Sequence, residues 1–312
     1  MTVVFTHPVF GEHETPPGHA EQRARYAAAL RGLSAGPLAD LERREAPLAE
    51  RGAILRAHDE AYVAKLEAAS PREGSVQLDP DTHMGPHSLD AARRGAGAAV
   101  AAVEAVMSGE AQTAFVASRP PGHHAVANAS MGFCLFNNVV VAARHAQAAC
   151  GAERVAVVDF DVHHGNGTQD LLWDDENAFF ASSHEYPQWP GTGAEDERGA
   201  HGQVHNARLL SGSGPDAFRL AWAERLLPAL DTFAPDLIVV SAGFDAHEAD
   251  PLGGLNLTES DFAWITGEIV AVAKRHASGR VVSILEGGYD LGALERSVAA
   301  HVSGLAGLSD PR

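Results

Sequence analysis

Short runs of β-branched and aromatic residues alternate with alanine-rich segments along almost the whole chain. The segments between the apolar runs have the apolar spacing that is typical of helices. Continuous apolar runs indicate strands buried on both faces, and their alternation with helices indicates a parallel sheet. The sequence therefore predicts an α/β fold with a parallel sheet between two layers of helices. The predicted strands are residues 3–6, 113–116, 155–160, 179–182, 237–241 and 281–285, and the predicted helices are residues 20–33, 89–107, 138–149, 215–233, 259–276 and 291–302.

The chain of 312 residues has no internal repeat, low-complexity linker or shift in composition that would mark a domain boundary. We expect residues 1–312 to form one domain, since single α/β domains reach this length. Short Gly/Pro-rich pieces follow predicted strands or precede predicted helices. Because ligands of open parallel sheets bind beyond the carboxyl ends of the strands, we expect the active site among these loops.

Composition restricts the partners and the compartment. The 23 basic and 41 acidic residues give a net charge of −18, which disfavours binding to nucleic acid or to an anionic membrane. Cys134 and Cys150 are the only cysteines and lie in different predicted elements, as expected in a reducing compartment. The N-terminal MTVVFTHPVF lacks the basic and long apolar regions of a signal peptide. We expect a cytoplasmic protein, and its composition leaves open whether it forms a homo-oligomer.

The segment VAVVDFDVHHGNGT at residues 155–168 is an apolar strand that runs directly into Asp159, Asp161 and His163. Alternate residues of an extended chain point to the same side, so these side chains are expected to lie together. The alternative is a surface loop, but charged groups at the end of a buried strand are costly unless they are paired or bind a metal. A metal site is therefore predicted here.

A catalytic zinc ion has three protein ligands and one open position. The segment SAGFDAH at residues 241–247 follows another predicted strand and supplies Asp245 as the third ligand. His247 and Asp250 lie in the same loop and are alternative ligands. The chemistry of the side chains does not separate these three residues.

Two further segments carry groups for proton transfer and carbonyl activation. RPPGHHA at residues 119–125 holds His123 and His124 in a loop stiffened by prolines. Adjacent histidines beside a metal site suggest proton transfer, with Asp159 or Asn166 setting a ring tautomer. In EGGY at residues 286–289, Tyr289 could donate its hydroxyl to a developing oxyanion. Alone, this last motif fits equally well a turn with a packed tyrosine.

In this order the motifs resemble the histone deacetylase family of the arginase-deacetylase superfamily, most closely its class II and bacterial histone-deacetylase-like branch. The resemblance rests on five motifs and an opening loop and spans nearly the whole chain. It implies one catalytic domain with the arginase-deacetylase fold. The motifs are RPPGHHA at 119–125, GFCLFNN at 132–138, DFDVHHGNGTQ at 159–169, SAGFDAHEADPLGG at 241–254 and EGGY at 286–289, with HPVFGEHETPPGHAEQRAR at 7–25 as the opening loop.

The resemblance implies a role for each matching residue. It gives the zinc ligands as Asp161, His163 and Asp245. It also implies that His124 is the general base, that His123 is its electrostatic or acid partner, and that Tyr289 polarises the acyl carbonyl. Asp159 would orient His123 and Asn166 would orient His124.

The substrate tunnel and a second ion also follow from the resemblance. Phe133 and Trp189 would form aromatic walls around an aliphatic linker, and the backbone of Gly132 would contact the substrate. Leu252 stands where polyamine-selective relatives carry a glutamate. A potassium ion near the active site would have as its ligands Asp159, Asp161, His163, Ser182 and Ser183.

The implied activity is zinc-dependent hydrolysis of the amide of N-acyl-lysine or of a similar acylated amine. An acetylpolyamine amidohydrolase is the nearest alternative, because an acidic protein tolerates a cationic polyamine. Leu252 favours acyl-lysine over polyamine. A two-manganese arginase-like site and an inactive acyl-lysine binding module are further alternatives, but the tandem histidines match the one-zinc deacetylases and none of the expected site residues is missing. The acyl length and the choice between zinc and iron in the cell are left open.

Overall fold

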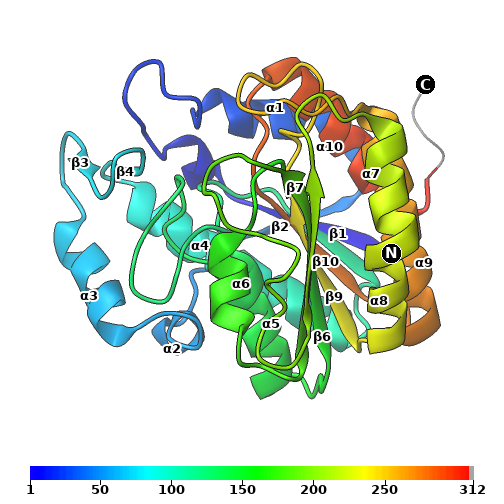
Figure 1. The fold of residues 1–312 in the computed structure, drawn as a ribbon. Coiled ribbons are helices and arrows are strands. Elements are labelled where there is room, and N and C mark those ends of the chain that lie inside the picture. Colours follow the sequence, from blue (N-terminus) through cyan, green and yellow to red (C-terminus); the bar gives the residue numbers. More distant parts are fainter. Residues whose placement is uncertain (309–312) are drawn as a thin grey trace.

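In the computed structural model, which describes residues 1–308, an eight-stranded sheet with only parallel neighbours forms the centre of the molecule (Figure 1). The predicted α/β fold class is confirmed. The strands, in their order across the sheet, are β2 (Glu42–Glu45), β1 (Thr2–Thr6), β5 (Thr113–Val116), β10 (Val281–Leu285), β9 (Leu237–Ala242), β6 (Val155–Asp159), β7 (Ala178–Glu185) and β8 (Val204–Leu209).

Each face of the sheet packs against its own layer of helices, because successive side chains of a strand point to opposite faces. In β6, Val155 and Val157 belong to the hydrophobic cluster beneath α4 (Ser88–Met107) and α5 (Asn138–Ala149), whereas Ala156 and Val158 belong to the cluster beneath α9 (Glu259–His276) and α10 (Leu291–Ala306). The first layer consists of α4, α5 and α6 (Asn166–Leu172), which packs beside α5 against β7, and α2 (Arg51–Ile54) and α3 (Glu60–Ala69) lie on the outer side of this layer (Figure 1). The second layer consists of α1 (Ala24–Gly32), α7 (Pro215–Ala221), α8 (Leu227–Phe233), α9 (Glu259–His276) and α10 (Leu291–Ala306).

The six predicted strands are present, but two strands of the sheet were not predicted. β2 has the sequence ERRE and β8 has the sequence VHNARL, so neither shows a continuous apolar run. Both lie at the edges of the sheet, where a strand has one neighbour and needs less apolar surface. A separate two-stranded ribbon, β3 (Val76–Gln77) and β4 (His83–Met84), also lies outside the predicted strands.

Three predicted helices differ from the structure. The helix predicted at 291–302 continues to Ala306. The helix predicted at 20–33 begins only at Ala24. The helix predicted at 215–233 is divided into α7 and α8 by a π-helical turn, Trp222–Leu226. Pro228 lies in the first turn of α8 and has no N–H to continue the regular hydrogen-bond ladder, which explains the interruption.

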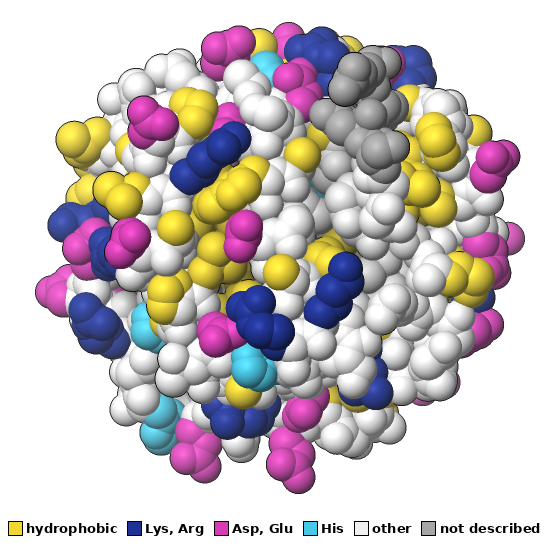
Figure 2. All heavy atoms as spheres, turned by 90° about the vertical axis from the view of Figure 1, so that its right-hand side faces the viewer, with side chains coloured by type: hydrophobic (Ala, Val, Ile, Leu, Met, Phe, Trp, Pro, Cys, Tyr) yellow, Lys and Arg dark blue, Asp and Glu magenta, His cyan; other side chains and the backbone are white. Residues whose placement is uncertain are grey.

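The exterior carries both signs of charge. On the face that shows the right-hand side of Figure 1, Lys and Arg side chains are interspersed with Asp and Glu side chains (Figure 2). Within residues 1–308, no helix combines the length and the apolar character needed to cross a membrane.

Candidate active site

Four central strands deliver the predicted site residues. β5, β10, β9 and β6 are consecutive in the sheet, and the chain leaves each of them at the same edge because they are parallel. The loops that follow them contain the tandem histidines, Tyr289, Asp245 and the pair Asp161 and His163. Side chains from four distant segments of sequence thus gather at one end of the sheet.

Asp161, His163 and Asp245 form a compact cluster in which one ligand atom of each residue lies within 4.8 Å of the others. His163 Nδ1 is 3.2 Å from Asp161 Oδ1 and 3.1 Å from Asp245 Oδ2. Two carboxylates and one imidazole are a donor set that zinc accepts, and three protein ligands leave a position for water or substrate. The cluster therefore fits a catalytic metal ion.

The backbone around the cluster fixes both carboxylates. Asp161 Oδ2 accepts a hydrogen bond from the Gly287 N–H at 2.9 Å, and Asp245 Oδ1 accepts one from the Val162 N–H at 2.8 Å. A Cβ atom on Gly287 would overlap both carboxylates, and one on Gly243 would overlap that of Asp161. The two glycines therefore allow the backbone to approach the cluster closely.

The pKa values of His163 and Asp245 also indicate that the Asp161, His163 and Asp245 cluster favours a bound positive charge. Burial alone would lower the pKa of His163, but the carboxylates of Asp161 and Asp245 raise it to about 10. Burial, with the charge of Asp161 adding to it, raises the pKa of Asp245 to about 7. A proton thus compensates the buried negative charge, and a metal ion would take its place, since metal ligands must be deprotonated.

The two alternative ligands from the sequence have other partners. His247 Nε2 lies 3.3 Å from Glu259 Oε1, at the start of α9. The carboxylate of Asp250 accepts hydrogen bonds from backbone N–H groups, the shortest from Tyr289 at 2.6 Å. Neither residue belongs to the metal-type cluster found within residues 1–308.

His123 and His124 lie with ring centroids 3.9 Å apart, and each has its own hydrogen-bond partner. His123 Nδ1 is 2.9 Å from Asp159 Oδ2, and His124 Nδ1 is 2.8 Å from Asn166 Oδ1. Because both Nδ1 atoms are occupied, the Nε2 atoms are the ones left for other partners.

The surroundings of His123 and His124 shift the pKa values of the two rings in opposite directions. Burial would lower the pKa of His123, but Asp161 and Asp159 raise it to about 10. Burial, and then the positive charges of His123 and His163, lower the pKa of His124 well below its usual value. One imidazole is therefore neutral and the other cationic at neutral pH. A bound divalent cation would oppose the contribution of Asp161, leaving Asp159 to hold the proton on His123.

Glu286 holds the loop of the tandem histidines and was not among the predicted site residues. Its fully buried Oε2 accepts hydrogen bonds from the N–H groups of Gly122 at 2.6 Å and His123 at 3.2 Å. The sequence could have indicated this role, because Glu286 opens the EGGY motif at the end of an apolar strand and a buried carboxylate requires hydrogen-bond partners.

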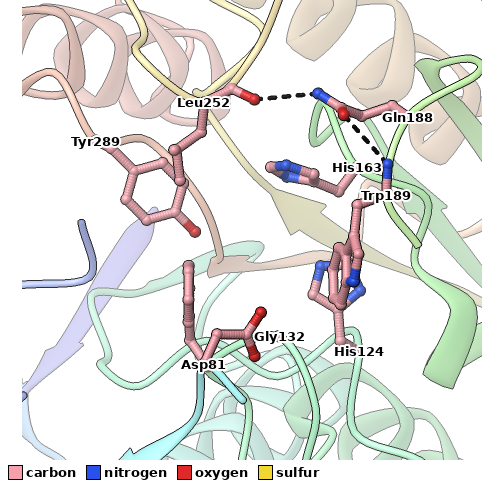
Figure 3. A pocket seen from close by; sticks show the side chains of 9 residues that line it. Asp81, His124, Gly132, His163, Gln188, Trp189, Leu252 and Tyr289 are labelled. Carbon is pink, nitrogen blue, oxygen red and sulfur yellow. Dashed lines mark hydrogen bonds between the residues drawn. The ribbon is translucent and has the colours of Figure 1, made fainter. Parts of the chain in front are cut away.

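Tyr289 follows a glycine pair and turns its hydroxyl into a pocket of about 260 Å³ (Figure 3). Within residues 1–308 this hydroxyl has no hydrogen-bond partner, so it is available to a ligand. Burial raises the pKa of Tyr289 well above its usual value, which keeps the hydroxyl protonated and able to donate. His124 and His163 line the same pocket.

The pocket walls are aromatic. Phe133 and Trp189 both line it together with Gly132, and Trp189 is 40% exposed at the mouth. The rings of Trp189 and His124 pack edge to face, with their centroids 4.7 Å apart. Gly132 and Phe133 both have positive φ, 54° and 70°, and the Phe133 N–H donates to Thr82 Oγ1 at 3.0 Å. This contact holds Phe133 in a conformation that costs energy for a residue with a side chain.

Three residues form the rim beside Tyr289, and two of them were not predicted. Leu252 was a predicted site residue, whereas Asp81 and Gln188, which also line the pocket, were not. Gln188 Nε2 donates to the Leu252 carbonyl at 3.2 Å, and Gln188 Oε1 accepts from the Trp189 N–H at 3.2 Å (Figure 3). Asp81 belongs to the loop before β4, a region to which the sequence motifs gave no function.

The residues expected near a potassium ion lie at the end of β6 and just beyond it, and in the middle of β7. Ser182 is the register partner of Asp159 across these strands. Its hydroxyl is 2.9 Å from His184 Nδ1, whereas the hydroxyl of Ser183 accepts from Trp222 Nε1 at 2.9 Å. Asp159 Oδ1 accepts from the Asp161 N–H at 3.0 Å.

Comparison with known proteins gives a consistent result. The histone deacetylase domain matches residues 19–305. A histone deacetylase-like amidohydrolase of Pseudomonas aeruginosa is 43% identical over 293 residues, which cover 91% of this chain and 77% of that protein. A probable deacetylase of Archaeoglobus fulgidus is 35% identical over 314 residues, covering 98% of this chain and 87% of that protein.

A solved structure extends this likeness to the fold. The crystal structure of the HDA15 HD domain superposes with a TM-score of 0.93 at 32% identity, and the match covers 99% of this chain and 89% of that one. The resemblance drawn from the motifs is thereby confirmed.

Proposed function

The chain belongs to the histone deacetylase family, and we propose that it is a zinc-dependent deacylase that hydrolyses the amide of N-acyl-lysine or of a similar acylated amine. We further propose that residues 1–312 form one catalytic domain. The observation that carries the proposal is that the Asp161, His163 and Asp245 cluster, the tandem histidines and the Tyr289 hydroxyl converge at one pocket. Such a set can bind a carbonyl group, supply a base and stabilise an oxyanion.

Asp161, His163 and Asp245 are the proposed zinc ligands. When bound there, zinc supplies Lewis acidity toward the acyl carbonyl and toward water. His163 lines the pocket, so a metal ion held by these three residues would be accessible to a ligand in the pocket.

His124 is the proposed general base. Its low pKa keeps it neutral, so it can accept a proton from the attacking water at neutral pH. Asn166 Oδ1 accepts a hydrogen bond from the Nδ1–H group of this ring, which leaves Nε2 as the basic nitrogen. His123 remains cationic against Asp159 and stabilises the negative charge that develops beside it.

Tyr289 is the proposed oxyanion donor. A hydroxyl that stays protonated, and that no protein group within residues 1–308 engages, can donate to the oxygen of the former carbonyl as negative charge develops on it. A protonated histidine then returns its proton to the leaving amine. The products are a carboxylate and a free amine.

The pocket walls suggest the substrate. Phe133 and Trp189 can pack against both sides of an aliphatic linker, such as the four methylene groups of lysine, and the Gly132 backbone borders the same channel. Leu252 adds an apolar contact at the rim. These features support an acyl-lysine substrate.

We also propose a cytoplasmic location. The two free thiols, Cys134 and Cys150, suit a reducing compartment.

A second candidate substrate is an acetylpolyamine, which the Asp81 carboxylate favours. Asp81 lies at the pocket rim of a chain with a net charge of −18. A carboxylate in this position attracts a cationic group that extends from the mouth. The apolar Leu252 on the same rim opposes this preference, because it offers the cation no partner.

We also propose a structural potassium ion between the end of β6 and the middle of β7. Oxygen atoms of carboxylates, hydroxyls and main-chain carbonyls suit such a hard cation. Asp159 and Ser182 face each other across the two strands, which supports a shared ion. The proposed ligands are Asp159, Asp161, His163, Ser182 and Ser183.

The test measures release of the acyl group from an acetyl-lysine peptide and from acetylspermidine with the zinc-loaded protein. Tyr289→Phe serves as the matched variant, since it removes one hydroxyl that makes no internal hydrogen bond within residues 1–308. We expect turnover of the peptide and a loss of about 10²- to 10³-fold in kcat in the variant. Preference for acetylspermidine would overturn the substrate assignment, and no turnover of either compound would overturn the deacylase proposal.

A further inference from the structure

Asp250 is a buried carboxylate that takes no part in the proposed metal site or in proton transfer. It is 7% exposed. Its Oδ2 accepts hydrogen bonds from the N–H groups of Tyr289 at 2.6 Å and Asp290 at 3.2 Å. Its Oδ1 accepts a third from the Leu252 N–H at 3.0 Å. Both oxygens thus accept hydrogen bonds from the backbone, and two of the three donors, Leu252 and Tyr289, belong to residues that line the pocket.

Tyr289 follows a glycine pair, whose backbone is restrained by hydrogen bonds and not by side chains. Gly287 and Gly288 have no side chains to restrain them, and Gly288 has a φ of 119° that few other residues adopt. Arg25 binds the carbonyl oxygens of Glu286 at 2.5 Å and Gly288 at 2.6 Å. Asp250 binds the N–H groups that follow. The glycine turn is therefore held from both ends by one cation and one anion.

Leu252 is held in the same way, through both of its backbone polar groups. Its N–H donates to Asp250, and its carbonyl accepts from Gln188 Nε2 at 3.2 Å. Figure 3 shows Leu252 on the same side of the pocket as Tyr289. Asp250 is the one residue with a hydrogen bond to the backbone of each within residues 1–308.

We propose that Asp250 is a positioning residue that sets the Tyr289 hydroxyl and the Leu252 side chain from a single carboxylate. The inference rests on the proposed function, in which Tyr289 acts in the transition state and Leu252 contacts the substrate. It gives Asp250 two separable effects, one on kcat through the tyrosine and one on KM through the leucine. A misplacement of about 1 Å in a catalytic group costs about 100-fold in rate.

The experiment compares Asp250→Ala with Asp250→Asn, each alone and combined with Tyr289→Phe. Alanine removes all three hydrogen bonds, whereas asparagine keeps one oxygen acceptor. We expect Asp250→Ala to lower kcat on the acetyl-lysine peptide by about 10- to 100-fold and Asp250→Asn to lower it less. In the Tyr289→Phe background either change should lower kcat by no more than about twofold, because the group that Asp250 positions is already gone.

Asp261→Asn is the matched control. Asp261 is also fully buried and accepts a backbone N–H, from Thr258 at 3.0 Å, but it lies at the start of α9 and pairs with Arg219. This change should lower the melting temperature while kcat stays at the wild-type value. Equal losses of kcat in the Asp250 and Asp261 variants, or an equal loss with and without Tyr289, would overturn the proposal.

Amide hydrogen exchange of the zinc-loaded protein tests the anchoring without turnover. The N–H groups of Tyr289 and Asp290 should exchange faster in Asp250→Ala than in the wild type, while zinc stoichiometry remains one per chain. Faster exchange in a protein that hydrolyses neither test substrate would separate a failure of the proposed function from a failure of this inference. Unchanged exchange would overturn the anchoring itself.

Discussion

His123 and His124 lie with ring centroids 3.9 Å apart and are inclined by 43°, yet a carboxylate binds the first ring and a carboxamide binds the second. Asp161 and Asp159 together raise the pKa of His123, whereas burial and the charges of His123 and His163 lower that of His124, whose hydrogen-bond partner Asn166 carries no charge. A carboxylate stabilises a neighbouring imidazolium, whereas a neutral amide does so much less. In the proposed mechanism, Asp159 therefore supports the cationic His123, and Asn166 leaves His124 as the neutral base.

Asn166→Asp should raise the pKa of His124, because the new carboxylate favours its protonated form by about one to three pKa units. The base works only when neutral, so the acid limb of the kcat/KM profile should move to higher pH. Activity should fall more at pH 6 than at pH 9. Asp159→Asn is the reciprocal control and should lower the pKa of His123. An acid limb that stays in place in Asn166→Asp would contradict the assignment of His124 as the base.

Removal of the metal should destabilise the protein. A ligand at 100 times its Kd stabilises the folded state by about 2.7 kcal/mol. For a chain of this size the melting temperature of the chelator-treated protein should drop by about 5 °C and recover on addition of zinc. Asp245→Ala should abolish the response to zinc, whereas His247→Ala, which changes a residue outside the cluster, should preserve it. A response lost with His247 but kept without Asp245 would contradict the ligand set.

Leu252→Glu should shift the substrate preference toward a cationic amine. A carboxylate at the half-buried rim adds about 1 kcal/mol of attraction, which corresponds to roughly fivefold. The ratio of kcat/KM for acetylspermidine to that for the acetyl-lysine peptide should rise accordingly. Leu252→Gln has a similar size without the charge and should leave the ratio near its wild-type value. If the two variants behave alike, charge at this position does not select the substrate.

His301 should make stability depend on pH. It is buried between the hydroxyls of Thr266 at 2.6 Å and Ser283 at 2.7 Å, and burial lowers its pKa to about 3. Above pH 6.5 the residue is neutral in both states and has no effect on the pH dependence. Between pH 6.5 and about pH 3 only the unfolded chain takes up the proton, so stability is lost as pH falls.

The free energy of unfolding should decrease by about 1.4 kcal/mol per pH unit in that window from this residue alone. Denaturant unfolding at several pH values measures the slope. His301→Gln should show a slope smaller by about that amount, even if its stability at pH 7.5 is also reduced. Parallel curves for the two proteins would contradict the prediction.

The sequence predicts the centre of the fold better than its periphery. β6 and β9 are buried on both faces, so their apolar runs are continuous and unambiguous. β2 consists of charged residues because it pairs with β1 alone, and its pairing depends on tertiary context that no local pattern contains. The π-helical turn before α8 could be anticipated only from Pro228, which by itself is also compatible with the first turn of a new helix.

The candidate site divides in the same way. Asp161 and Asp245 follow directly from strand ends, so a parallel sheet suffices to bring them together. Asp81 and Gln188 reach the rim through irregular loops, whose paths depend on contacts such as the hydrogen bond between the Phe133 N–H and Thr82 Oγ1. The sequence alone does not separate Asp250 from a metal ligand, because its carboxylate has the same chemistry, and only the hydrogen bonds from the Tyr289 and Leu252 N–H groups distinguish it.

The rim residues Asp81 and Gln188 and the metal-type cluster come from different parts of the chain, so the two can change independently in evolution. Asp81 and Gln188 lie on connections that contribute no residue to the Asp161, His163 and Asp245 cluster. Mutations there can alter which amine is accepted while the hydrolytic chemistry stays intact. Leu252 is the exception, because Asp250 ties it to Tyr289. Directed evolution of substrate range should therefore succeed first in the loops of Asp81 and Gln188, and should trade selectivity against turnover in the loop of Leu252.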